Sequence, residues 1–169
     1  MKLFGINILI LILVLSQYLL GSIIPDNIKQ SEYIFIIDIK KQKNYLYFKD
    51  TLIDTFIIST GSKNRYKGNR EMPEGLWRLT KKMNQKEINN VFKERAAIYG
   101  PRLISLEKYS EKKQAFVKTN RAFHGTNEPE NIGSPTSMGC VYHYNEDIIY
   151  LYDFIPENTL VISTNEYYD

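Results

Sequence analysis

Apolar residues are arranged in two different ways along this chain. Near the start they form a dense run from Leu3 to Leu20, with an uninterrupted core from Ile8 to Leu15. Lys2 is the only charged residue before Asp26. A basic start followed by a short apolar run is typical of a secretory leader, and the run shows no polar helical face. We therefore predict that residues 1–25 are a signal peptide or an uncleaved membrane anchor.

The leader carries a prediction about localisation. Its apolar core is short for a membrane span, but the whole run of residues 3–20 approaches the length of one. Leu19 and Leu20, at the expected cleavage position, are larger than the residues preferred there. Cleavage and anchoring both stay open, and either predicts an exported domain in the periplasm or cell-wall space. If residues 3–20 remain in the membrane, Lys2 keeps the N-terminus on the cytoplasmic side.

Beyond the leader, apolar residues come in short stretches separated by polar ones. Residues 26–32 predict a short linker, and residues 33–169 predict one domain. β-branched and aromatic stretches predict an antiparallel meander of three strands and then further short strands. The predicted strands are 33–39, 45–48, 52–59, 76–80, 103–106, 115–119 and 159–163. The Lys-rich residues 40–44 predict a hairpin tip rather than a binding patch.

Two segments have the signals of short helices. Asn84 and Glu87 have the spacing of a capping box, and apolar residues then recur on one helical face as far as residue 92. A second helix is predicted over residues 146–154, with Asn145 as its N-cap and acidic residues in its first turn. The exported part is therefore expected to be mostly β with one or two helices.

Composition narrows the functional classes. The 169 residues include 22 Lys and Arg against 19 Asp and Glu, a near balance that does not favour nucleic-acid binding. One cysteine and two histidines are too few for a Cys/His-rich structural zinc site. The single cysteine cannot form an internal disulfide, so an unpaired thiol in an exported protein requires its own explanation.

Cys140 and His124 form the candidate chemical pair. Cys140 follows Gly139 outside any apolar strand, and a neighbouring glycine lets a substrate approach the backbone closely. His124 precedes Gly125 at the expected end of a strand, and a loop containing Pro and Gly separates it from Cys140. An imidazole that accepts the thiol proton makes cysteine a nucleophile. His143 is an alternative base, and an inert buried cysteine in a structural module is the competing interpretation.

Several blocks of the sequence resemble the YkuD-type L,D-transpeptidases. In chain order they are Ile57-Ile58-Ser59-Thr60-Gly61, Met72-Pro73-Glu74-Gly75-Leu76-Trp77, His124-Gly125-Thr126-Asn127-Glu128-Pro129, Ile132-Gly133-Ser134-Pro135 and Ser137-Met138-Gly139-Cys140-Val141. The resemblance covers residues 33–163 and implies a mainly β (β-rich α+β) fold, a single β-sandwich-type domain with one or two short helices. Two positions depart from the family pattern, because Met138 stands where many members have His and Tyr142 where many have Arg or Asn.

The resemblance also implies a reaction on peptidoglycan stem peptides. Cys140 would attack the carbonyl of the third stem residue, release the terminal D-Ala and form a thioester. His124 would be the base, oriented by the Gly125 carbonyl, and the amides of Gly139 and Cys140 would be oxyanion donors. An amine of a neighbouring stem, or another amine, would then take the acyl group, a neighbouring stem giving a 3-3 cross-link. The resemblance implies no metal or organic cofactor, and we expect a monomer.

Four further residues are candidates for substrate binding, namely Ser137, Arg121, Arg102 and Tyr99. Guanidinium groups bind carboxylates bidentately, which suits the two arginines, and Ser137 is also expected to buttress the loop before Cys140. Two functional alternatives stay open. A hydrolase would pass the same acyl group to water and trim stem peptides, whereas a non-catalytic peptidoglycan-binding protein would keep the fold with a degenerate site.

Overall fold

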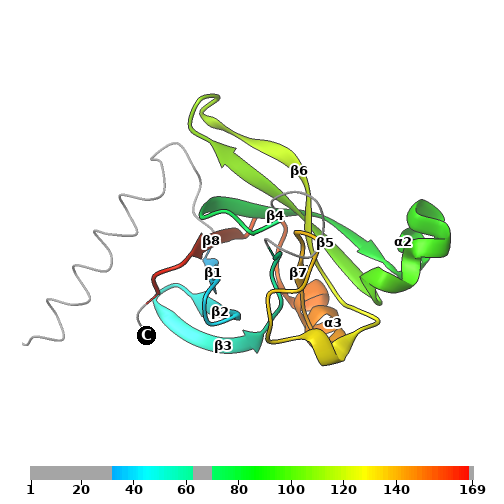
Figure 1. The fold of residues 1–169 in the computed structure, drawn as a ribbon. Helices are drawn as coiled ribbons and strands as arrows, with labels where there is room; N and C mark the ends of the chain where they lie inside the picture. The colour runs from blue at the N-terminus through cyan, green and yellow to red at the C-terminus, as the bar shows by residue number, and fades with distance from the viewer. Residues whose placement is uncertain (1–31, 63–69, 168–169) are drawn as a thin grey trace, which may run out of the picture. The chain divides into compact units, whose positions relative to one another are not determined.

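The computed structural model describes residues 32–62 and 70–167 of the 169-residue chain. The predicted leader (1–25) and residues 26–31 of the predicted linker lie outside the described residues. Figure 1 shows the arrangement of the elements. The strands are β1 (Tyr33–Asp38), β2 (Lys43–Phe48), β3 (Thr51–Ile57), β4 (Gly75–Asn84), β5 (Arg102–Ser110), β6 (Ala115–His124), β7 (Val141–Tyr142) and β8 (Leu160–Thr164). The helices are α2 (Gln85–Phe92) and α3 (Asn145–Phe154), with 3-10 helices η1 (Lys93–Tyr99) and η2 (Pro129–Asn131).

All of these strands belong to one sheet, in the order β3-β2-β1-β8-β4-β5-β6-β7. Neighbouring strands are antiparallel except in two pairs, β1 with β8 and β6 with β7, which are parallel. The predicted three-stranded meander is confirmed as β1-β2-β3, and residues 39–42 form the turn of the Lys-rich hairpin tip. The mainly β prediction is confirmed as well.

The two edges of the sheet approach each other at one corner. Beyond β3, Ser59 forms a bridge with Tyr142 of β7, and Gly61 forms a second bridge with Ser137. Ser59 and Tyr142 exchange both backbone hydrogen bonds, at 3.0 and 2.8 Å. The sheet is therefore curled, and its closing corner brings residues 59–61 next to residues 137–142.

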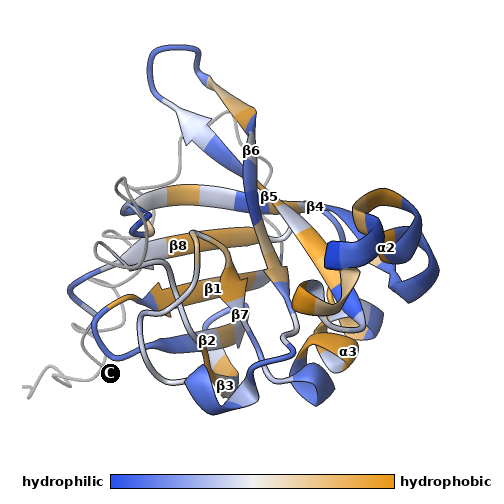
Figure 2. Ribbon diagram, turned by 45° about the vertical axis from the view of Figure 1, so that its right-hand side comes forward, coloured by the Kyte–Doolittle hydropathy of each residue, from blue (hydrophilic) through white to orange (hydrophobic). Residues whose placement is uncertain are grey.

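The main core consists of side chains from the central strands and α3. Phe35, Trp77, Phe123 and Leu151 are among its members, and each is at most 1% exposed. Burying one large apolar side chain contributes about 1.5–3 kcal/mol. The Trp77 indole donates a hydrogen bond to a serine hydroxyl of β8 (2.8 Å), so its polar atom is satisfied in the core. Figure 2 shows hydrophobic positions gathered along β1 and β8 and in α3.

A smaller apolar cluster lies on the other face of β5 and β6. It contains Met83, Ile88, Ala96, Leu103 and Ala122, with Phe92, Tyr99 and Cys140 packed against it. Adjacent strand residues point to opposite faces, so Leu103 and Ala122 contact this cluster while Ile104 and Phe123 contact the main core. Met83 comes from β4, α2 and η1 supply Ile88, Phe92, Ala96 and Tyr99, and Cys140 immediately precedes β7. The contact of Cys140 with this cluster places the candidate site on this face of the sheet.

One predicted helix cap is confirmed and the other is wrong. Asn84 accepts from the Glu87 amide (3.1 Å) and the Glu87 carboxylate accepts from the Asn84 amide (2.9 Å), which is the predicted capping box. Asn145 is instead the first residue of α3, and its side chain accepts a hydrogen bond from the Thr126 amide (2.9 Å). Within the described ranges, no helix is long and apolar enough to cross a membrane.

Candidate active site

The end of β6 and the segment before β7 bring His124 and Cys140 to one face of the sheet. In the parallel ladder, Phe123 pairs with Val141 and His124 pairs with Tyr142. Cys140 immediately precedes β7 and packs against the smaller cluster, which contains Leu103, the partner of His124 in the β5–β6 ladder, so Cys140 lies on the face that His124 occupies. The prediction that a strand ends at His124 is confirmed. The fold therefore brings these two residues, which are distant in sequence, to one face of the sheet.

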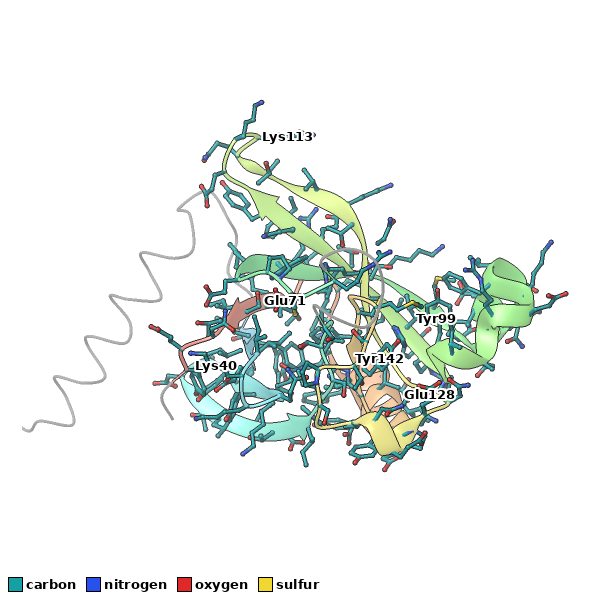
Figure 3. All side chains as sticks on the ribbon, in the orientation of Figure 1. Lys40, Glu71, Tyr99, Lys113, Glu128 and Tyr142 are labelled. Carbon is teal, nitrogen blue, oxygen red and sulfur yellow. The ribbon has the colours of Figure 1, made fainter. Side chains whose placement is uncertain are left out.

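The His124 imidazole has a fixed tautomer. It is 1% exposed, and Nδ1 lies 2.6 Å from the Gly125 carbonyl oxygen. A carbonyl only accepts, so Nδ1 carries the proton and Nε2 keeps its lone pair. Burial lowers the pKa of His124 to about 4, and the Gly125 carbonyl opposes this only in part. The rings of Tyr99 and Tyr142, labelled in Figure 3, flank the imidazole at centroid distances of 4.9 and 4.7 Å.

Gly125 and Gly100 meet around the Asn145 side chain. A Cβ at Gly125 would lie 2.2 Å from Asn145 Oδ1, and a Cβ at Gly100 would lie 2.5 Å from the same atom. The oxygen needs this space because it accepts the hydrogen bond from Thr126, the residue after Gly125. Asn145 therefore holds the turn that aims the Gly125 carbonyl at His124. Sequence reasoning missed this role, since Asn145 has the ordinary signature of a helix cap.

The Cys140 thiol is set against the smaller apolar cluster. It donates to the Asn120 carbonyl oxygen at 3.8 Å, and within the described ranges no hydrogen bond joins it to His124. Burial raises the pKa of the Cys140 thiol, while a hydrogen bond from the Ala122 amide and the positive charge of Arg121 lower it. The resting pair is therefore a neutral thiol next to a neutral imidazole, because burial disfavours the charged form of both groups.

Ser137 braces the loop that carries the cysteine. Its hydroxyl donates to the Cys140 carbonyl (2.5 Å) and accepts from the Gly139 amide (3.1 Å). Ser137 is fully buried, so it is a buttress of the loop, as predicted, and not the substrate contact that was also predicted. Gly139 has φ of +121°, a backbone conformation that favours glycine. Its amide is occupied by Ser137, whereas the Cys140 amide has no partner among the described residues.

The remaining candidates for substrate binding lie in different surroundings. Tyr99 is at the site, where it contacts the His124 ring and where burial and the neighbouring Cys140 raise the pKa of its phenol. Arg121 is also beside Cys140. Arg102 is not brought to the thiol, since its guanidinium stacks on Tyr152 of α3, 5.0 Å from the ring centroid, on the face opposite Leu103.

His143, the alternative base, lies on the wrong face of the ladder. It is fully buried against Phe123, with a ring-centroid distance of 4.8 Å, and its Nε2 pairs with Asn44 Nδ2 at 3.1 Å. Burial lowers the pKa of His143 to about 3. This histidine is a core residue and does not face Cys140. In the described part of the chain, no three His, Cys, Asp or Glu side chains gather as metal ligands do.

Comparison with known proteins agrees with this geometry. The sequence model of YkuD, the L,D-transpeptidase catalytic domain, matches residues 32–162, which include the whole His124–Cys140 region. The chain belongs to the YkuD family. Among curated proteins, YkuD of Bacillus subtilis (strain 168) is 41% identical over 44 residues, 26% of this chain and 27% of that protein. This family member therefore aligns with about a quarter of that curated relative.

Two solved structures share the fold of this YkuD domain. Bd1075 of Bdellovibrio bacteriovorus superposes with a TM-score of 0.60 at 19% identity, over 81% of this chain and 49% of that one. The L,D-transpeptidase of Xylanimonas cellulosilytica superposes with a TM-score of 0.55 at 18% identity, over 88% and 68% of the two chains. Identities this low compare folds, so the predicted single β-rich YkuD-like domain is confirmed at that level.

Proposed function

We propose that this protein is an L,D-transpeptidase that acylates Cys140 with a peptidoglycan stem peptide. The observation that carries the proposal is the juxtaposition of His124 and Cys140 on one face, with His124 Nδ1 held by the Gly125 carbonyl. That bond leaves Nε2 as the basic nitrogen on the cysteine side of the sheet. Family membership supplies the substrate class, a stem peptide that ends in a D-residue.

The first half-reaction follows from the neutral resting pair. The thiol proton moves to His124 Nε2, and Cys140 Sγ bonds to the carbonyl carbon of the third stem residue. The bond from that carbon to the nitrogen of the terminal D-Ala breaks, and His124 returns the proton to the leaving amine. The Cys140 amide is the available oxyanion donor in the described region, since the Gly139 amide donates to Ser137. The product is a thioester on Cys140 and free D-Ala.

In the second half-reaction the acceptor decides the product. A side-chain amine of a neighbouring stem attacks the thioester, loses its proton to His124 and leaves a 3-3 cross-link with a free thiol. Water in the same position gives a trimmed stem instead. We propose the amine as acceptor, and we propose export through the leader of residues 1–25, because stem peptides of assembled peptidoglycan lie outside the cytoplasmic membrane.

Intact mass spectrometry of the protein with tetrapeptide fragments of peptidoglycan tests the proposal. The expected result is a Cys140 adduct with the mass of the stem less D-Ala, absent in Cys140→Ala. Soluble products then separate the acceptors, because a cross-linked dimer indicates transfer to an amine and a tripeptide indicates transfer to water. A folded wild-type protein that forms no adduct with several stem chemistries would favour the non-catalytic binding protein.

A further inference from the structure

Three backbone segments that are remote in sequence meet beside the nucleophile. A Cβ at Gly61 would lie 1.8 Å from the Arg70 carbonyl oxygen and 2.9 Å from the Gly139 Cα. The three segments are therefore in direct backbone contact, and side chains are excluded from their meeting point. Hydrogen bonds from Ser137 to Thr60 (3.0 Å) and from Ser62 to Ser137 (3.3 Å) continue this contact. Cys140 is the residue that immediately follows this junction.

The Arg121 guanidinium joins two of the three segments. Nη1 donates to the Gly139 carbonyl oxygen, and Nη2 donates to the Glu71 carbonyl oxygen at 2.8 Å. The base of the side chain is fixed as well, since the Arg121 amide donates to Thr119 Oγ1 (3.1 Å) within β6. A planar fork can hold two acceptors in a fixed geometry, which a lysine ammonium does not reproduce.

The same guanidinium lies close enough to the Cys140 sulfur for the two charges to interact. Arg121 lowers the pKa of the thiol, and a Cys140 thiolate in turn raises the pKa of Arg121 against the effect of burial. The other titratable groups around the pair are Tyr99 from η1, His124 from β6, Arg70 from the adjoining segment and Lys108 from β5. Among them, Arg121 is the cation that donates to the residue before Cys140 and whose charge lowers the pKa of the thiol.

We propose that Arg121 is a positioning residue that ties the Gly139 carbonyl to the Glu71 segment and thereby fixes the nucleophile beside a permanent positive charge. This role rests on the proposed reaction at Cys140. It differs from the sequence-based expectation that Arg121 grips a carboxylate of the stem peptide, because the two terminal nitrogens already donate to backbone carbonyls. A residue that acts on the nucleophile changes thiol reactivity in the absence of substrate, whereas a residue that grips substrate does not.

Alkylation of the full chain by iodoacetamide between pH 6 and 10 tests this role without any peptidoglycan. In Arg121→Gln we expect the pH midpoint of alkylation to rise by about one unit, so the rate below the midpoint falls about tenfold. Arg78→Gln is the matched control, since it removes another partly buried arginine, one that pairs with Glu107 (2.7 Å) on β5. That control is expected to keep the wild-type midpoint. An unchanged midpoint in a folded Arg121→Gln protein would overturn the proposal.

Arg121→Lys separates the effect of the positive charge from the effect of the hydrogen bonds to the Gly139 and Glu71 carbonyls. Lysine keeps the positive charge but cannot bridge both carbonyls, so we expect a near wild-type alkylation midpoint and a kcat for D-Ala release that falls several-fold at unchanged KM. A raised KM at unchanged kcat would overturn positioning in favour of substrate binding. If wild-type protein releases no D-Ala but the Arg121→Gln midpoint still rises, the proposed function fails and the assignment of Arg121 to the thiol holds. Circular dichroism of each variant verifies folding.

Discussion

The two faces of the β6–β7 ladder each bury one histidine, and the two histidines differ in their surroundings and in their expected roles. On one face His124 lies between two tyrosine rings on the side that carries Cys140. On the other face His143 packs against Phe123 in the main core. Burial lowers the pKa of both, to about 4 and about 3. A buried histidine with a lowered pKa is therefore not diagnostic of catalysis, and the difference lies in which nitrogen stays unpaired and what it faces.

The largest expected effect is on catalytic activity, in the two matched variants His124→Gln and His143→Gln. His124→Gln removes the proton acceptor, and we expect D-Ala release to fall by about 10²–10⁴-fold because positioned acid–base groups contribute that much. His143→Gln keeps a side chain that can bond Asn44 and leaves the other face intact, so most activity should remain. Release of D-Ala from a stem tetrapeptide measures both. Equal losses in two folded variants would contradict the assignment of roles.

A second test uses pH to measure how the lowered pKa of the two buried histidines affects stability. Each histidine has a lower pKa in the folded state than its value of about 6.5 in the unfolded chain, so between those values the unfolded state binds more protons. Stability from each group is fully present above about pH 6.5 and is lost as the pH falls towards about 4 for His124 and about 3 for His143. The full loss is on the order of 3 kcal/mol for His124 and on the order of 5 kcal/mol for His143.

Urea unfolding at a series of pH values between 7 and 4 measures this loss. Wild type should show the steepest decline in the free energy of unfolding, and His143→Gln and His124→Gln should each decline less. Comparing variants at the same pH cancels the contribution of the carboxylates. A decline that is identical in wild type and both variants would show that neither histidine is protonated only on unfolding.

The sequence predicted the elements of this fold better than the contacts between them. The β1-β2-β3 meander and the Asn84 capping box depend on residues close together in the chain, so local pattern was sufficient. The two-residue strand β7 was missed, because its pairing with β6 is set by the curled sheet and not by any periodicity of its own. Cys140 and His124 were found from residue types and from the resemblance.

The surroundings of Cys140 and His124 were less predictable, because contacts between residues far apart in the chain determine them. Asn145 has the local sequence signature of an N-cap, yet its side-chain oxygen accepts a hydrogen bond from the Thr126 amide, in a turn about twenty residues earlier in the chain. Arg102 and Arg121 carry the same charge and lie in the paired strands β5 and β6, but Arg102 stacks on Tyr152 of α3 whereas Arg121 donates to the Gly139 carbonyl, and these distant contacts cannot be inferred from local sequence. Ser137 was predicted both as a buttress and as a substrate contact, and burial decides between these two roles.

A third test adds one side-chain carbon next to His124, at a position where the structure has no space for it. In Gly125→Ala the new Cβ would lie 2.2 Å from Asn145 Oδ1, so the turn that aims the Gly125 carbonyl must shift. We expect a loss of about 1–3 kcal/mol in the free energy of unfolding, as in other overpacked sites, together with reduced D-Ala release. Adding Asn145→Gly should recover part of the stability by removing the obstructing atom. A single variant as stable and active as wild type would contradict this account of the turn.

The smallest expected effect lies on the core face, in the pair of Asn44 and His143. The pair is only partly satisfied, since Asn44 Oδ1 has no hydrogen-bond partner among the described residues. Asn44→Leu removes the donor to His143 Nε2 and should cost about 1–3 kcal/mol, because it leaves a buried acceptor unpaired. Asn44→Leu combined with His143→Phe replaces both partners by apolar groups and should cost less than the sum of the two single variants. Urea unfolding at pH 7 measures this coupling, and strict additivity would mean that the bond contributes nothing.

Activity should be nearly unchanged in all three proteins, because neither side chain faces Cys140. This outcome would show that the two faces of one ladder can be altered independently.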